Sequence, residues 1–146
     1  MQDVFERPVA RALVSGGGDA PMLRGTVCFY QRPGGVLVVA RVSGLPRQTG
    51  FFGFHIHEGS VCMGLNFSDT GSHYNPMGHG HPNHAGDLPP LLGYGGRAYL
   101  AVITDRFGIG DVLGRTVVIH SDADDFTTQP AGNAGRKIGC GVIKKV

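Results

Sequence analysis

Short segments of alternating apolar and polar residues, each bounded by glycine or proline, run through most of this chain. A period of two places alternate side chains on opposite faces of a strand, and no segment keeps a 3.6-residue helical period over three turns. Seven strands are expected, at 9–14, 23–31, 35–45, 51–58, 97–105, 114–120 and 137–146, and an eighth has no boundary that the pattern fixes. The sequence therefore predicts an all-β fold.

The size of the chain fits one domain, because 146 residues can enclose a single hydrophobic core. Twenty-five glycines and nine prolines suit many tight turns between short strands. With 41% hydrophobic and 16% charged residues, the composition argues against disorder. We find no internal repeat and no linker, so residues 1–146 are expected to form a single domain.

Charge and hydropathy exclude two classes of partner. The formal net charge is only +2 and the basic residues are scattered, which argues against nucleic acid. No apolar run is long enough to span a membrane, and residues 1–18 lack the apolar core of a signal peptide. A cytoplasmic protein is expected from the chain as written. The alternative is a periplasmic or extracellular protein whose leader has been removed.

Two connections, residues 59–96 and 121–136, show almost no strand pattern. Loops of this length in a small β-protein need something to organise them. Metal ions and a disulfide are the candidates, since the chain contains seven histidines and three cysteines.

Three histidines lie on segments expected to be strands. His55 and His57 flank Ile56, so both imidazoles should project from one face while Ile56 enters the other. His120 ends the apolar segment "RTVVIH". Neutral imidazoles on rigid strands suit copper or zinc. Taken alone, His120 would fit an ordinary hydrogen-bonded histidine, but a His-x-His pair beside a second histidine cluster favours a metal.

The second cluster lies within the first long connection. It comprises His73, His79, His81, His84 and Asp87. Three imidazoles and a carboxylate satisfy a closed tetrahedral zinc site, which would pin a flexible loop. The alternative is a histidine-rich, metal-scavenging tract, but that alternative does not predict histidines on distant strands.

Several motifs carry a resemblance to a known family. "GFHIHE", "GSHYNP", "HAGDL", "GRTVVIHSDADD", "GNAG" and "CGVI" resemble copper–zinc superoxide dismutase, in that order and across nearly the whole chain. "HEGSVC" and "HAGDLPPL" look closer to bacterial members. The resemblance implies a Greek-key antiparallel β-sandwich, or flattened barrel, of about eight strands with two long functional loops. It also implies an enzyme that converts superoxide to dioxygen and hydrogen peroxide by copper redox cycling, with zinc structural.

The resemblance also implies a role for each metal-ligand candidate. The implied copper ligands are His55, His57, His73 and His120, and the implied zinc ligands are His73, His81, His84 and Asp87. His73 would bridge the two metals, release copper in the reduced state and carry a proton. His79 is left over, either exposed to solvent or competing with His81.

One carboxylate and one pair of cysteines acquire roles by the same resemblance. Asp124 would join the copper ligand His55 to the zinc ligand His81 and fix both rings, whereas Asp122 and Asp125 suit a solvated turn. Cys62 would form a disulfide with Cys140. The unpaired Cys28 alternates with Val27 and Phe29, so we expect it to face outward as part of an interface or as a reactive thiol.

The sequence departs from the family pattern beside the copper site. Family members place an arginine three residues before the last cysteine, and here that position is Lys137. A lysine keeps the positive charge but loses the planar, two-pronged donor geometry, so superoxide should be attracted but positioned less well. A one-residue shift that restores the neighbouring Arg136 is the alternative.

A second functional class stays open at this point. A non-enzymatic copper- or zinc-binding domain, such as a metallochaperone or a metal store, would use the same ligands. Lys137, in place of the usual arginine, is the one feature that favours this alternative. A structural zinc domain that never receives copper is a third hypothesis. A homodimer and a copper-delivery protein are compatible with the resemblance, but the sequence assigns neither a surface.

Overall fold

The computed structural model describes residues 6–146, so the first five residues of the expected domain lie outside it. The described part contains short strands and two helical turns. The strands are β1 (Ala10–Gly16), β2 (Arg24–Arg32), β3 (Gly35–Ser43), β4 (Thr49–Phe52), β5 (Phe54–His57), β6 (Leu91–Tyr94), β7 (Ala98–Thr104), β8 (Thr116–His120) and β9 (Lys137–Lys145). The helical turns are the 3-10 helix η1 (Leu65–Thr70) and α1 (Ile109–Val112). Within the described residues, no helix has the length and apolar character to cross a membrane.

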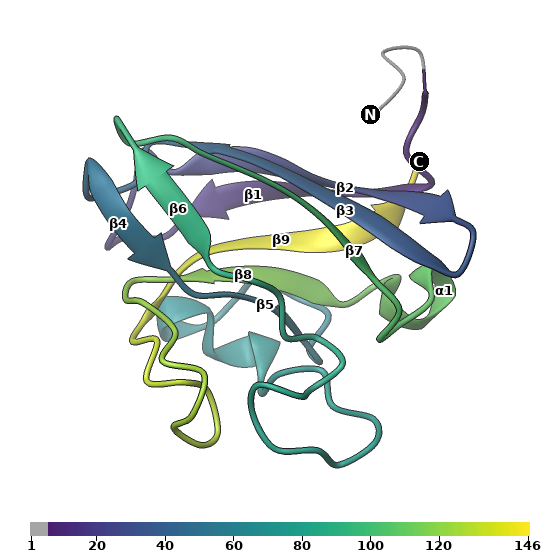
Figure 1. Cartoon of the computed structure of the whole chain (residues 1–146). Coiled ribbons are helices and arrows are strands. Elements are labelled where there is room, and N and C mark those ends of the chain that lie inside the picture. Colours follow the sequence, from purple (N-terminus) through teal and green to yellow (C-terminus); the bar gives the residue numbers. More distant parts are fainter. Residues whose placement is uncertain (1–5) are drawn as a thin grey trace.

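Seven strands form one antiparallel sheet in the order β5-β8-β9-β1-β2-β3-β7, and β4 pairs with β6 in a small second sheet. The large sheet curls, so that β1, β2 and β3 face β9, β8 and β5 across the core (Figure 1). The first and last strands, β1 and β9, are neighbours in this sheet. The curled antiparallel sheet confirms the predicted all-β sandwich or flattened barrel.

The strand expected at 51–58 is divided at Gly53 between the two sheets. β4 pairs with β6, whereas β5 pairs with β8. The backbone of Gly53 fixes this crossing, because its amide donates to Asp122 and its carbonyl accepts from the amide of His120. The four-residue strand β6 lies inside a connection that showed no strand pattern.

The period-two pattern of β2 and β3 fills the core from one face. Val27 and Phe29 are fully buried there. Cys28 points to the opposite face as expected, but it packs in a separate small cluster with Tyr30 and Val39 and is buried. The expected exposure of the Cys28 thiol is therefore wrong, because Tyr30 of the same strand and Val39 of β3 pack against it.

Two long loops cover the outer face of β5 and β8, and we call them the first loop (residues 58–90) and the second loop (residues 121–136) (Figure 1). Every residue of β5 and β8 is buried, on one face by the hydrophobic core and on the other by these loops. A disulfide between Cys62 and Cys140 ties the first loop to β9, which confirms the expected pairing.

Candidate metal centre

Alternation along β5 separates its histidines from the core. Phe54 and Ile56 belong to the hydrophobic core, whereas His55 and His57 project from the other face, as the sequence predicts. His120, at the end of β8, projects beside them, with its Nε2 3.2 Å from the Nε2 of His57. Strand geometry therefore delivers three imidazoles to one buried point beneath the two loops.

His73 completes the first group of histidines. It follows η1 in the first loop and forms a backbone bridge with His57. Its ring stacks on that of His55 with 4.0 Å between centroids. One ring nitrogen from each of four residues falls within 4.8 Å of the others, and these residues are His55, His57, His73 and His120.

The Nδ1 side of the His73 ring faces a second group of possible metal ligands. His73 Nδ1 lies 2.8 Å from Asp87 Oδ1 and 3.2 Å from His84 Nδ1. Asp87 Oδ2 lies 3.0 Å from His81 Nδ1 and 3.2 Å from His84 Nδ1. The structure thus brings together all four residues expected at the zinc site, and His73 is shared by both groups.

Hydrogen bonds fix the outer nitrogen of most of these imidazoles. His57 Nδ1 donates to the carbonyl of Gly71 over 2.8 Å, and His120 Nδ1 lies 3.4 Å from the carbonyl of Gly135. His55 and His81 each donate through Nε2 to Asp124, over 2.7 Å in both cases. An imidazole that donates from one nitrogen presents a lone pair on the other, as metal-ligating histidines do.

Three of the inner nitrogens form no hydrogen bond with any described residue. They are His55 Nδ1, His73 Nε2 and His81 Nδ1, all buried; His81 Nδ1 lies 3.0 Å from Asp87 Oδ2 but forms no hydrogen bond with it. The Nε2 lone pairs of His57 and His120 face each other at 3.2 Å, which is repulsive unless a cation lies between them. Four imidazoles suit copper, and three imidazoles with a carboxylate suit zinc, so the donor sets fit the two metals.

Burial lowers the pKa of the three strand histidines, so they stay neutral and able to bind a metal. Burial lowers the pKa of His57, and it lowers the pKa of His120 to about 3, with smaller contributions from neighbouring positive charges that include Lys137. Burial likewise lowers the pKa of His55. For Asp87, burial raises the pKa, but hydrogen bonding with His73 and nearby positive charge outweigh it, so the pKa is lowered overall. The carboxylate therefore stays ionised as a ligand.

Asp124 joins the two groups from the second loop. Its two carboxylate oxygens accept from His55 and His81, and Oδ1 also accepts from the amide of Phe126. Gly132 allows the Asp124 carboxylate to sit here, because it has no Cβ where its backbone packs against that carboxylate and because its φ of 71° favours glycine. A Cβ at Gly132 would lie 2.1 Å from Asp124 Oδ1 and 2.6 Å from His81 Nε2.

Lys137 lies beside the first group, where its positive charge helps to lower the pKa of His57 and His120. It stands opposite His120 in the β8–β9 register, and its Nζ donates to Thr70 Oγ1 over 2.8 Å and to the carbonyl of Gly71 over 2.9 Å. The Nε of Arg136 instead pairs with Asp19 over 3.2 Å at the surface. The alternative register that would exchange these two residues is therefore wrong.

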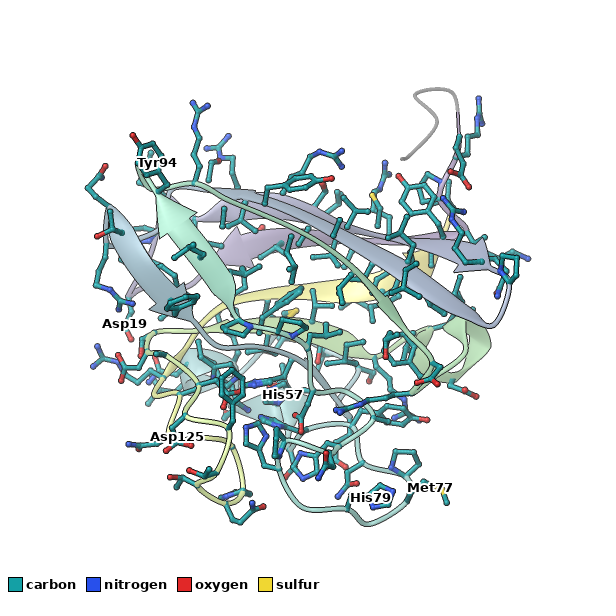
Figure 2. All side chains as sticks on the ribbon, in the orientation of Figure 1. Asp19, His57, Met77, His79, Tyr94 and Asp125 are labelled. Atoms are coloured by element: carbon teal, nitrogen blue, oxygen red, sulfur yellow. A yellow bond between two sulfur atoms is a disulfide. The ribbon has the colours of Figure 1, made fainter. Side chains whose placement is uncertain are left out.

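His79 belongs to neither group. Its side chain is exposed, and its backbone is held by the side-chain amide of Asn75. Figure 2 shows His79 near Met77 at the outer edge of the first loop, whereas His57 lies beneath the sheet. Of the two alternatives for His79, the structure shows exposure to solvent and not competition with His81.

Sequence reasoning missed one side chain that holds the first loop to the second. Gln129 forms two hydrogen bonds with the backbone of His81, accepting from its amide and donating to its carbonyl, each over 2.8 Å. No local signal marks a glutamine for this task, because the contact joins residues 48 positions apart.

Comparisons with known proteins agree on one family. A family model described as copper/zinc superoxide dismutase matches residues 23–143. A Cu-Zn superoxide dismutase of Deinococcus radiodurans is 38% identical over 143 residues, covering 84% of this chain and 78% of the relative. Superoxide dismutase Cu-Zn 3 of Arabidopsis thaliana is 38% identical over 152 residues, covering 92% of this chain and 88% of the relative.

Two solved structures show the same likeness in three dimensions. The crystal structure of the clock protein EA4 matches with a TM-score of 0.79 and 34% identity, covering 100% of both chains. A double mutant of a SOD-like protein from Bacillus subtilis matches with a TM-score of 0.79 and 28% identity, covering 90% of this chain and 95% of that one.

Proposed function

The chain belongs to the copper/zinc superoxide dismutase family, and we propose that the residues around His73 carry that family's reaction here. Two superoxide anions and two protons give one dioxygen and one hydrogen peroxide. Copper supplies the one-electron oxidation and reduction when it is bound, since zinc has no redox chemistry. The observation that carries the proposal is the shared ring of His73, which presents Nε2 to one histidine group and Nδ1 to the other.

We assign the first group to copper and the second to zinc. The copper ligands are His55, His57, His73 and His120, and the zinc ligands are His73, His81, His84 and Asp87. The second group contains the only carboxylate among these ligands, which suits a closed zinc site that holds the first loop in place.

His73 is assigned a proton-carrying role in addition to binding. Its Nδ1 is held by the second group, so its ring stays oriented whether or not its Nε2 binds copper. When Nε2 is free it can hold a proton within the buried site and deliver that proton to the reduced oxygen species. Asp124 acts only through the rings that it orients.

Lys137 is assigned the attraction of the substrate. It is the cation beside the first group, and a fixed positive charge raises the local concentration of an anion such as superoxide. The second loop also carries Asp122 and Asp125 at its exposed surface, and their negative charges oppose the attraction of the anion by Lys137.

Domain organisation, compartment and partners are proposed on separate grounds. The main hydrophobic core draws on residues from Ala10 to Ile143, which supports a single domain. The disulfide supports an oxidising compartment, periplasmic or extracellular, over the cytoplasm.

Exposed apolar side chains on the small sheet support a homodimer. They are Phe51, which pairs with Leu92 across β4 and β6, and the neighbouring Tyr94. The buried copper ligands support delivery of copper by a partner protein.

The experiment is to load one copper and one zinc per chain and to follow superoxide decay directly, with His120→Ala as the variant that lacks a copper ligand. Decay faster than the spontaneous reaction in the wild type, and its loss in His120→Ala, is expected. Decay in the wild type no faster than the spontaneous reaction, with metal content verified, would assign the ligands to a non-enzymatic metal-binding protein instead.

A further inference from the structure

The ammonium group of Lys137 occupies a fixed position, which is unusual for a lysine. The side chain is half-buried at the start of β9. Two of its three N–H groups are used, one by Thr70 Oγ1 and one by the carbonyl of Gly71. The tetrahedral geometry leaves the third N–H for another acceptor, the substrate anion among them.

Thr70 is built to accept a hydrogen bond rather than to donate one to Lys137. Its side chain is fully buried at the end of η1. Its hydroxyl proton is directed to the carbonyl of Phe67 over 2.8 Å, so the oxygen lone pairs face the ammonium. A hydroxyl has a single proton, so once that proton is donated to one carbonyl the oxygen can form further hydrogen bonds only as an acceptor.

The second acceptor, the carbonyl of Gly71, is tied to a copper ligand. It accepts from Nδ1 of His57 over 2.8 Å as well as from Lys137 over 2.9 Å. The position of the ammonium is therefore defined relative to the His57 ring. Thr70 supplies the second point of attachment, without which the flexible lysine could rotate about a single bond to Gly71.

We propose that Thr70 is a positioning residue for the substrate anion, because its hydroxyl and the Gly71 carbonyl hold the Lys137 ammonium beside the copper histidines. An arginine has a rigid planar fork, whereas a lysine reaches comparable placement only through external acceptors. The inference rests on the proposed role of Lys137. It adds that Lys137 depends on Thr70 for its geometry.

The test measures the affinity of azide, a monovalent anion, for the copper- and zinc-loaded enzyme through the absorption spectrum of Cu(II). Thr70→Val keeps the shape but removes the acceptor, and azide affinity should fall roughly tenfold, the usual scale for a hydrogen bond to a charged group. Thr70→Ser keeps the hydroxyl and should bind azide within about twofold of wild type.

A double-mutant cycle separates positioning from general damage. In a Lys137→Met background, Thr70→Val should cause no further loss of azide affinity. Wild-type affinity in Thr70→Val, or an equal loss in the Lys137→Met background, would overturn the inference. Azide binding needs no turnover, so failure of the dismutation proposal and failure of this one give different results.

A second measurement needs no variant. In the zinc-loaded, Cu(I) enzyme, which is diamagnetic, NMR should show slowly exchanging Nζ protons for Lys137 compared with the exposed Lys144. Exchange as fast as that of Lys144 would show that Lys137 is not held and would overturn the inference even if Thr70→Val failed to fold.

Discussion

His55 donates a hydrogen bond from Nε2 to Asp124 Oδ2 over 2.7 Å, with both side chains buried. The other oxygen of Asp124 accepts from His81 over the same distance. One carboxylate therefore selects the tautomer of one ligand in each group, and it does so from a loop that contributes no ligand itself. Orientation of the two metal sites is coupled through a single side chain.

Replacing Asp124 with asparagine should weaken both sites. An amide offers one acceptor oxygen, and its NH2 group would oppose one of the two imidazole N–H groups. Copper and zinc affinities should each fall about 10–100-fold, the range for such outer partners. Competition titration with chelators measures both. Asp122→Asn, at an exposed position on the same loop, is the matched control, and equal affinities in the two variants would contradict the coupling.

Gly132→Ala should destabilise the protein severely. The new Cβ would lie 2.1 Å from Asp124 Oδ1, and the residue has a φ of 71°, which favours glycine. We expect a loss of about 3 kcal/mol or more in the free energy of unfolding, measured in urea. Gly18→Ala meets no atom within 4 Å and should change it by less than about 0.5 kcal/mol. Similar losses in both variants would refute the steric explanation.

Gln129→Leu should lower zinc affinity without removing a ligand. The amide of Gln129 forms both backbone hydrogen bonds of His81, so its loss leaves two backbone groups unpaired and the imidazole less well placed. Zinc affinity should fall by about tenfold. Gln48→Leu makes the same chemical change at an exposed site and should leave zinc affinity unchanged. The idea fails if Gln129→Leu binds zinc like the wild type.

The metal-free protein should lose stability as the pH falls below about 6.5. Burial holds the pKa of His120 at about 3 when folded, against 6.5 for an unperturbed histidine, so the unfolded chain binds more protons between these values. His55 and His57 shift in the same direction. Each contributes a slope of about 1.4 kcal/mol per pH unit within its own window.

Urea unfolding of the metal-free protein between pH 8 and pH 4 measures this dependence. Above pH 6.5 these histidines should contribute no slope, and His120→Gln should show a shallower fall below it than the wild type. A stability that stays constant from pH 6.5 to pH 4.5 would contradict the burial of neutral imidazoles.

The sequence predicts the parts of the site that lie on regular strands. Period-two alternation places His55 and His57 together on one face of β5, and the end of an apolar segment places His120 beside them. The first loop contains four histidines, whereas the expected zinc site takes three, and residue types alone do not decide which one is left out. The family resemblance selected His81 and His84, and the structure excludes His79 from the group.

The contacts that the sequence did not predict are long-range and lie in irregular backbone. Thr70 meets Lys137 across 67 positions and Gln129 meets His81 across 48, through loops that have no periodicity to read. The burial of Cys28 depends on Val39 of the neighbouring strand and on Tyr30. β6 is only four residues long, too short for alternation to stand out from its surroundings.

The most direct test of the proposed function is pulse radiolysis of the copper- and zinc-loaded protein, with the superoxide decay rate measured over a range of salt concentrations. Catalysed decay that slows as salt is added is the expected result, because screening weakens the attraction between Lys137 and the anion. Decay no faster than the spontaneous reaction, with both metals verified in place, would contradict the assignment of superoxide dismutation to this site.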